Sequence, residues 1–453
     1  MSVLPLRGNG NMRFPLITVI HRRLAHTVMA LYAVQVATYL VPLATIPYVA
    51  RVLGPGEWGR LAVAQAAGCY VMVLVEFGFG LSATREVARR RSDRRQVAEI
   101  LSSVLAAKLA LTLAAAAILL AVFRFVPLLR DSFLLVFMAL LWAVTRAFNL
   151  MWFFQGLERV RFAASIEVAG NAAGAAAIFA VVQAPSDAWK VLLCQAAGCL
   201  LALGAQLAAA WREFPPQWPR LRSIWDGLVI GASMFVFRSA VSFYTSANVV
   251  VVGQLGGALT AGLFAGAEKL CRAGVRLQDP FWQALYPRLC FLRGQDKKRA
   301  GVTAKIGTLI LVGFGFVSSI LLFLASPFLV RILLGAQYFA AVPIVRIMAF
   351  LPLTVGIACA IAFQWMLPLG RDREMTWAAV CGGAWSIGVS LALFPLYGPR
   401  GVAFATVTAE LVVSAYYLIG LRSFRRKANA ATRAVAPAIY LKRTTTSMQI
   451  EGR

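Results

Sequence analysis

The sequence holds few charged residues, and most of those it has are basic. Asp, Glu, Lys and Arg make up only 14% of its 453 residues, whereas soluble globular domains carry about a quarter. Eighteen acidic residues stand against 45 basic ones, for a formal net charge of +27. The basic residues lie mainly in short segments between apolar runs, where they act as orientation signals. We therefore expect no nucleic-acid partner.

Patterns for metal, redox and nucleotide chemistry are also missing. The two histidines, His21 and His26, lie at the start of the first apolar run, and the seven cysteines form no CxxC pair. Neither a zinc site nor a disulfide framework is indicated. The sequence contains no GxxxxGK[ST], HExxH or GxSxG motif, and so no P-loop and no obvious nucleophile. We expect no metal and no cofactor. A membrane enzyme acting on a lipid-linked sugar is disfavoured, because such enzymes usually need acidic residues in sizeable outer loops.

Long apolar runs dominate what is present. Hydrophobic residues make up 60% of the chain, and the mean hydropathy is +0.74. Runs of about 18 or more apolar residues indicate membrane-spanning helices rather than a β-barrel. The pattern predicts an all-α polytopic membrane protein with about twelve transmembrane helices. The expected spans lie near residues 27–50, 60–82, 98–122, 132–154, 162–183, 188–211, 224–252, 258–287, 303–333, 341–367, 375–395 and 401–421.

The number of basic residues alternates between high and low in successive loops, and this predicts the orientation of the chain in the membrane. Residues 83–97 hold six basic side chains, whereas residues 253–257 hold none. Because basic loops stay in the cytoplasm, both termini are predicted to lie inside. The first apolar run is too long for a cleavable signal peptide. The last four residues, Ile450 to Arg453, match a factor Xa cleavage sequence, and whether they are native stays open.

Short motifs recur about two hundred residues apart and predict two lobes of six helices. Leu53-Gly54 and Gly59 between spans 1 and 2 resemble Leu255-Gly256 and Gly262 between spans 7 and 8. Six spans separate the copies, so both have the same orientation in the membrane. The predicted organisation is an N-terminal lobe over 1–211, a cytoplasmic linker over 212–223, a C-terminal lobe over 224–423 and a basic tail over 424–453.

Residues 258–290 carry an unusual polar stripe within an apolar span. At about 100° per residue, its charged side chains and one glutamine fall within an arc of about 100°. The stripe comprises Glu268, Lys269, Arg272, Arg276, Asp279 and Gln283. A charge at the bilayer centre costs roughly 2.5–3.5 kcal/mol, so the stripe should face a wet or protein-lined interior. Internal pairs, Glu268 with Arg272 and Arg276 with Asp279, are an alternative explanation that stays open.

Other polar residues within spans extend the prediction to a central cationic cavity. Basic side chains outnumber acidic ones there, which favours an anionic substrate, and guanidinium groups suit phosphate oxygens. Lys108 is expected to extend its ammonium group to the membrane interface. The candidate substrate-binding residues are Arg146, Arg238, Lys269, Arg272, Arg276, Arg346, Asn149, Gln35 and Gln283. The candidates for coupling or gating are Glu76, Glu268, Asp279 and Arg85. Transport could be coupled to protons or to sodium through the carboxylates among them.

Residues 39–91 resemble the start of the polysaccharide transport family. The segments that carry the resemblance are YLVPLATIPYVARVLGPGEWGRLAVAQA and LVEFGFGLSATREVARRR, with NLMWFFQGLERVRFAA at 149–164 and YGPRGVAFATVTAELV at 397–412. The resemblance spans roughly residues 25–425. Its last segment is shared with the larger superfamily, which includes multidrug exporters and lipid II flippases.

The resemblance implies a flippase of the bacterial inner membrane. Such proteins move undecaprenyl-diphosphate-linked oligosaccharide units from the cytoplasmic to the periplasmic leaflet for O-antigen, capsule or exopolysaccharide synthesis. The implied partners are this glycolipid, membrane lipid, a polysaccharide polymerase and a chain-length regulator. The alternatives are a multidrug exporter and a lipid II flippase. A multidrug exporter would favour acidic cavity residues, whereas this sequence has a basic excess, and a lipid II flippase typically has fourteen spans rather than twelve, so both are disfavoured. The sequence leaves the glycan, the driving ion and the oligomeric state open.

Overall fold

The computed structural model of the protein is helical throughout the residues it describes. These are residues 14–123, 132–219, 221–282, 295–367 and 371–423, with Leu285, Leu289 and Leu292. The side chains of Gln35 and Arg238, the residue Gln283 and the tail after Ser423 lie outside the described part. The all-α fold class predicted from the hydropathy pattern is confirmed.

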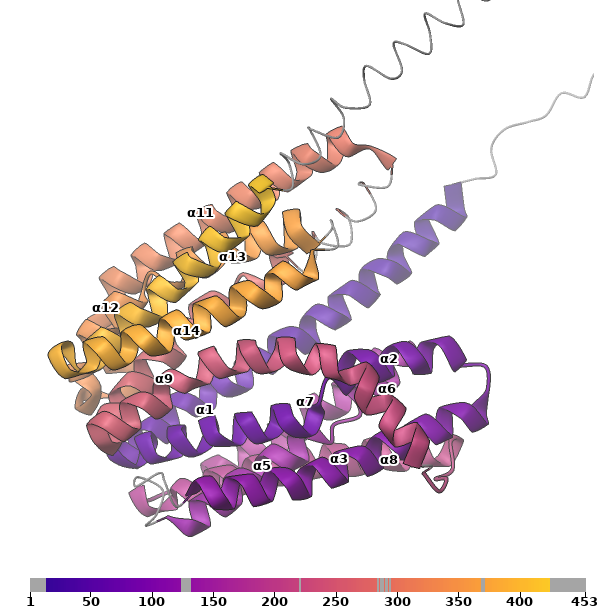
Figure 1. Ribbon diagram of the computed structural model, residues 1–453, viewed down its shortest axis with the longest axis horizontal. Helices are drawn as coiled ribbons and strands as arrows, with labels where there is room; N and C mark the ends of the chain where they lie inside the picture. The colour runs from indigo at the N-terminus through magenta and orange to yellow at the C-terminus, as the bar shows by residue number, and fades with distance from the viewer. Residues whose placement is uncertain are drawn as a thin grey trace, which may run out of the picture.

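The helices follow the chain in the order shown in Figure 1. The first half contains α1 (Phe14–Glu76), α2 (Phe79–Arg90), α3 (Arg94–Phe123), α5 (Phe133–Ala147), α6 (Met151–Gly156), α7 (Val160–Val181) and α8 (Ala188–Glu213). The second half contains α9 (Leu221–Arg276), α11 (Lys297–Leu329), α12 (Val342–Met348), α13 (Leu351–Ile361), α14 (Asp372–Tyr397) and a final helix over Pro399–Ser423. Short π and 3-10 turns join the helices between α11 and α14: η2 (Val330–Leu334), η3 (Ala336–Ala341) and η4 (Ala362–Met366).

Ten segments of the described part are long and apolar enough to cross a membrane. The chain is thus a multi-pass membrane protein, and the count of twelve spans stays a prediction. Two helices exceed any bilayer: α1 has 63 residues and α9 has 56, whereas about 20 suffice to span the hydrocarbon core. Each of them is interrupted by one glycine.

The two interrupting glycines share one backbone conformation. Gly54 has φ 70° and ψ 168°, and Gly257 has φ 76° and ψ −178°. A positive φ with an extended ψ is essentially restricted to glycine. The two positions are 203 residues apart, as are Gly59 and Gly262. The repeat is therefore shifted by one residue from the sequence pairing, and Gly54 corresponds to Gly257 rather than to Gly256.

The halves of the molecule cross at the second pair of glycines. A Cβ atom on Gly59 would overlap the carbonyl oxygen of Ala258, and one on Gly262 would overlap the carbonyl oxygen of Pro55. The contacts are reciprocal, because Pro55 and Ala258 are also 203 residues apart. Such self-complementary pairing is the signature of a local two-fold relation.

Hydrogen bonds close the end of the molecule at which the helices cross. The Tyr338 hydroxyl donates to the Ala50 carbonyl at 3.0 Å, and the Gln337 amide donates to the Arg51 carbonyl at 3.0 Å. The Arg51 guanidinium donates to the Ile332 carbonyl. From this end, α11, α13, α14 and the final helix diverge from α3, α5, α7 and α8 (Figure 1). The divergence opens toward the end where α1 begins and the final helix ends.

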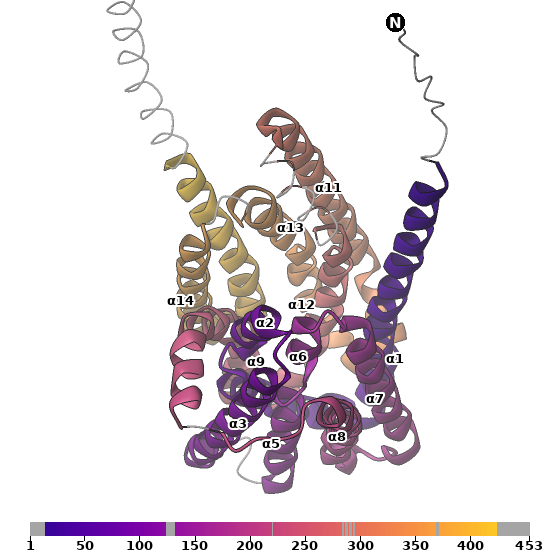
Figure 2. The ribbon, with the colours of Figure 1, turned by 90° about the vertical axis from the view of Figure 1, so that its right-hand side faces the viewer.

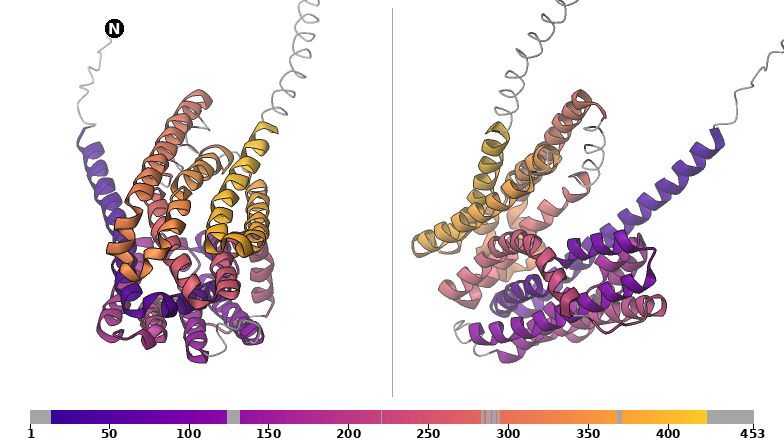
Figure 3. Two further views of the ribbon diagram at one scale, coloured as in Figure 1. Left: turned by 90° about the vertical axis from the view of Figure 1, so that its left-hand side faces the viewer. Right: turned by 45° about the vertical axis from the view of Figure 1, so that its right-hand side comes forward.

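The two sides of the diverging end differ. The first half of α9 leans on the first half of the chain, where Phe235 stacks on Phe77 with ring centroids 4.5 Å apart. The start of α1 instead extends away from the bundle (Figures 2 and 3). The lobe boundaries at 211 and 224 remain a prediction, because α9 contacts both halves.

Four predicted spans are not continuous helices. The span expected over 258–287 breaks at Leu277 and Gln278, the span over 341–367 breaks between α12 and α13, and two more break earlier in the chain.

The span expected over 60–82 breaks at Phe77 and Gly78, which have φ of 43° and 77°. The span expected over 132–154 breaks between α5 and α6. Backbone breaks at membrane depth need partners inside the protein, and each of these two earlier breaks is covered by buried side chains.

Candidate functional site

The first part of the polar stripe, from Glu268 to Arg276, lies on the part of α9 that follows Gly257. Asp279 lies beyond α9, after a turn at Leu277 and Gln278. The residues of the stripe have very different surroundings. Glu268 is 6% exposed, Lys269 and Arg272 are half-buried, and Arg276 at the helix end is exposed. The stripe is therefore a gradient from a buried end beside the crossing to an open end.

Lys269 joins the two halves of the molecule. Its Nζ donates to Gln65 Oε1 at 3.0 Å and lies 4.2 Å from the ring centroid of Trp58. Both partners belong to the second segment of α1, and Trp58 is only 2% exposed. A cation over an indole face is attracted by about 0.5–2 kcal/mol, depending on desolvation. No carboxylate is recorded within salt-bridge distance of Lys269 in the described part.

Arg272 and Glu268 form the internal pair that the sequence predicts. Arg272 Nε lies 2.7 Å from Glu268 Oε1, and an Arg272 Nη donates to the Thr245 carbonyl at 3.2 Å. Thr245 lies before Gly257, so this contact ties the two segments of α9 together. The alternative of internal pairing is thus confirmed for Glu268 and Arg272.

The outer part of the stripe contacts the second half of the chain. Asp279 Oδ1 accepts a hydrogen bond from the Trp282 indole at 3.1 Å. Trp282 stacks on Phe363 with ring centroids 4.0 Å apart. Gln283, the last predicted member, lies outside the described residues.

Arg146 and Asn149 lie at the break between α5 and α6. Arg146 is exposed in the last turn of α5, and Arg146 and Glu167 both lie within electrostatic range of Cys199. Asn149 Oδ1 accepts from the Met151 backbone N–H at 2.6 Å, which satisfies the start of α6. Its side-chain oxygen is therefore already engaged by the backbone.

Lys108 supports the same break, and its predicted position at the interface is wrong. The residue is 1% exposed, and its Nζ donates to the Ala147 carbonyl at 2.6 Å. Gln206 accepts from the Leu150 N–H at 3.0 Å and donates to the Ala163 carbonyl at 3.3 Å. A broken helix leaves backbone groups unsatisfied, and Lys108 is held inside because it supplies one missing donor.

The remaining predicted residues are dispersed. Arg346 is exposed, and it donates to Ser326 Oγ at 3.3 Å and lies 5.7 Å from the Phe323 ring, so its partners are on α11. Arg85 is exposed on α2, and Glu76 is half-buried at the end of α1. Gln35 and Arg238 have side chains outside the described part.

A buried hydroxyl cluster lies apart from the stripe. Asn248 donates to Ser386 Oγ at 3.0 Å and to Thr406 Oγ1 at 2.8 Å. Ser386 and Ser390 donate to Asn248 Oδ1 at 3.2 and 3.3 Å. Every side-chain group of Asn248 is thus paired, and the cluster fastens α9 to α14 and the final helix. No group of three His, Cys, Asp or Glu side chains that could hold a metal occurs in the described part of the chain.

The loops opposite the crossing are held by polar contacts. Asp93 caps α3, and its Oδ1 accepts from the Gln96 and Arg95 N–H groups at 3.1 and 3.0 Å. The hydrogen bond from Gln96 is the main reason that the pKa of Asp93 is lowered. The carboxylate of Glu213 accepts a hydrogen bond from Arg159, which raises the pKa of the Arg159 guanidinium.

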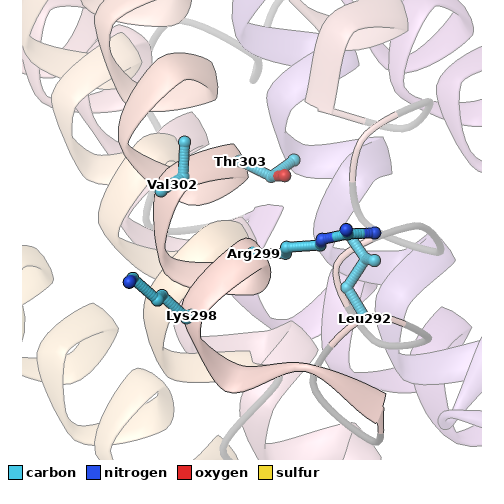
Figure 4. A pocket seen from close by; sticks show the side chains of 5 residues that line it. All are labelled: Leu292, Lys298, Arg299, Val302 and Thr303. Atoms are coloured by element: carbon cyan, nitrogen blue, oxygen red, sulfur yellow. The ribbon is translucent and has the colours of Figure 1, made fainter.

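A separate pocket of about 370 Å³ lies at the start of α11 (Figure 4). Its lining residues are Leu292, Lys298, Arg299, Val302 and Thr303. Arg299 also pairs with Asp296 at 3.4 Å. The pocket lies on the outer part of α11 and shares no residue with the stripe.

The candidate residues predicted from the sequence do not include Trp58, Gln65 or Gln195. Gln65 Nε2 donates to Gln195 Oε1 at 3.3 Å, which extends the contact of Lys269 to α8. The only available signal was that each is a polar or amphipathic residue within an apolar run. Their proximity depends on contacts between residues 130 and 204 positions apart.

Comparison with known proteins identifies the family. The family described as polysaccharide biosynthesis protein matches residues 24–292, which is more than half of the chain. The chain belongs to this family. The matched region contains the EFGFGLSATREVA block, so the resemblance predicted from the sequence is confirmed.

The chain is similar in sequence to a named transporter and in fold to two solved ones. A protein of Escherichia coli (strain K12) named "Putative O-antigen transporter" is 26% identical over 402 residues, covering 88% of this chain and 97% of that protein. An inward-facing multidrug resistance MATE family transporter of the MOP superfamily superposes with a TM-score of 0.68 at 15% identity, covering 87% of this chain and 96% of that one. The lipid II flippase MurJ in an inward closed conformation gives 0.66 at 14% identity, covering 86% and 87%. This member of the polysaccharide biosynthesis family therefore has the MOP fold.

Proposed function

We propose that the protein is a flippase for undecaprenyl-diphosphate-linked oligosaccharide units, acting as a transporter and not as an enzyme. It would move them from the cytoplasmic to the periplasmic leaflet of the bacterial inner membrane, for O-antigen, capsule or exopolysaccharide synthesis. The family and the name of the Escherichia coli relative support this class of substrate. A polymerase and a chain-length regulator would act on the product.

The observation that carries the proposal is the ammonium group of Lys269 between the two halves, which forms no recorded salt bridge in the described part of the chain. Arg272 is balanced by Glu268, whereas the recorded partners of Lys269 are the neutral Gln65 and Trp58. A membrane-embedded charge held against neutral groups marks a functional site by default. A diphosphate supplies the opposite charge, and ammonium groups bind phosphate oxygens.

Alternating access is the mechanism that the arrangement favours. The halves meet at the glycine crossing and are fastened there by Tyr338 and Gln337. They diverge at the other end, which the loop charges predict to be cytoplasmic. The diphosphate would enter from that end, the sugars would occupy the space between the halves, and the polyprenyl tail would stay in lipid. Glu76, Glu268 and Asp279 are the carboxylates proposed for coupling to protons or sodium.

Two other transport functions are less well supported. A multidrug exporter of organic cations would favour acidic residues in its cavity, whereas the polar stripe of this chain holds Lys269 without a recorded salt bridge in the described part. A lipid II flippase acts on the same kind of diphosphate lipid, so the basic site alone does not separate it from the proposal. The Escherichia coli relative, named for O-antigen transport and aligned over 97% of its length, favours the oligosaccharide unit.

The test is translocation of a fluorescent undecaprenyl-diphosphate oligosaccharide in proteoliposomes, with Lys269→Gln as the variant. Loss of a charge-assisted hydrogen bond costs about 1.5–3 kcal/mol, so transport should slow roughly ten- to a hundred-fold. Lys305→Gln is the matched control, because Lys305 is exposed on α11 and its replacement should leave the rate unchanged. Export of a small organic cation by the unmodified protein, without movement of the glycolipid, would overturn the proposal in favour of multidrug export.

A further inference from the structure

A chain of hydrogen bonds runs from Lys269 to a second amide side chain. Lys269 Nζ donates to Gln65 Oε1 at 3.0 Å, and Gln65 Nε2 donates to Gln195 Oε1 at 3.3 Å. An ammonium group has donors only, so the oxygen of Gln65 must face Lys269. Its NH2 group must then face the oxygen of Gln195, which fixes the direction of both amides.

The chain ends in a donor without a recorded partner. Both oxygens of the amide pair are occupied, which leaves the NH2 group of Gln195 at the end. Within the described part of the chain, no hydrogen bond from this group is recorded, and Gln195 is half-buried. This nitrogen is not among the buried polar atoms that lack a partner in the described part, so it is accessible to a ligand. A structural link between helices would not need such a donor, whereas a ligand subsite would.

The position of the amide pair suits a polar group attached to the bound anion. Gln65 and Lys269 lie about two helical turns beyond Gly59 and Gly262, roughly 10 Å from the crossing. Gln65 comes from α1, Gln195 from α8 and Lys269 from α9. The three side chains therefore lie near the point where the halves begin to diverge, and Gln195 is one amide group away from the cation.

We infer that Gln65 and Gln195 form a sugar-binding subsite beside Lys269, in which the free Gln195 NH2 group donates to the first sugar of the glycolipid. This inference rests on the proposed function, because it assigns Lys269 to the diphosphate. The first sugar is attached directly to that diphosphate, and its hydroxyl or N-acetyl oxygens accept hydrogen bonds. Sites that hydrogen-bond a substrate group discriminate strongly against ligands without it, because their polar atoms are left unpaired.

The experiment compares three probes on the purified full-length protein in nanodiscs. They are undecaprenyl diphosphate without sugar, the same lipid with one N-acetylglucosamine, and the same lipid with one glucose. Gln195→Met removes the donor and keeps the length of the side chain. It should weaken binding of the better glycosylated probe about five- to ten-fold and change binding of the bare diphosphate less than two-fold. Lys269→Gln should weaken binding of all three probes.

The controls separate this inference from the proposed function. Gln155→Met alters an exposed glutamine on α6 and should change none of the affinities. If the unmodified protein binds a glycosylated probe no better than the bare diphosphate, or if Gln195→Met weakens both kinds of probe equally or neither, the sugar subsite is refuted and the flippase proposal stands. If the unmodified protein binds none of the three lipids, the proposed function fails first.

Discussion

Lys269 lies 4.2 Å from the ring centroid of Trp58 and 3.0 Å from Gln65 Oε1, so one ammonium group contacts two residues of the other half of the molecule. Both contacts are neutral. The two contacts hold the ammonium group in place without a salt bridge, which is the arrangement that the proposed anion site uses.

The contact between Lys269 and Gln65 should contribute to stability as a pair. Lys269→Met and Gln65→Leu should each destabilise the protein, because each leaves the other side chain without this partner. The double variant should lose less than the sum, by a coupling energy of about 0.5–1.5 kcal/mol. The free energy of unfolding of the unmodified protein, the two single variants and the double variant, measured by denaturation in mixed micelles, gives this coupling energy. Strict additivity would show that the contact has no energetic weight.

Gly262→Ala should prevent the observed arrangement of the two halves. The added methyl would meet the Pro55 carbonyl oxygen, a backbone atom that cannot rotate away. We expect poor accumulation in the membrane or a large fall in melting temperature. Gly313→Ala in α11 is the matched control, since nothing lies within 4 Å of the added atom. That change should be neutral or stabilising by up to about 1 kcal/mol, and equal behaviour of the two variants would contradict the crossing.

Asn248→Ala should destabilise the second half without altering the site. The substitution removes the bonds to Ser386, Ser390 and Thr406. It leaves the two buried serine hydroxyls without their recorded partner. The expected loss is about 1–3 kcal/mol, measured by denaturation in micelles. Ser165→Ala, which removes an exposed hydroxyl bonded within its own helix, should have almost no effect.

The cap of α3 should make stability depend on pH at the acidic end. The pKa of Asp93 is lowered in the folded protein by the backbone N–H of Gln96. A lowered folded pKa gives stability that is present above the unfolded pKa, near 4, and is lost as the pH falls through the folded value. Asp93→Asn keeps a good cap and should flatten this acid limb, whereas Asp93→Ala should lower the melting temperature at pH 7. An unchanged acid limb in Asp93→Asn would exclude the carboxylate as its source.

Periodicity predicted the features that depend on local geometry. The stripe on α9 follows from helical spacing, and the Glu268–Arg272 pair follows from residues four apart on one face. The fold class followed from the apolar runs in the same way. These predictions needed no knowledge of which helices touch.

Features that depend on distant partners were beyond the sequence. The carbonyl that binds Lys108 lies 39 residues away, and without it a lysine near a helix middle is expected at the interface. The break at Phe77 depends on packing against α9, and Gln195 matters only because α8 brings it to Gln65. The predicted pairing of the repeats was shifted by one residue at this position. Gly256 and Gly257 are adjacent glycines that the sequence cannot distinguish, and only Gly257 has a positive φ.

The reciprocal contact of Gly59 and Gly262 restricts how the two halves can move. Two helices whose backbones touch at one point can tilt about that point while the contact is kept. Sliding one along the other would bring the side chains that flank each glycine against a carbonyl oxygen. The crossing thus permits a change in the angle between the two halves. It opposes a displacement of one half along the other. Any conformational cycle that keeps this contact must proceed by rotation.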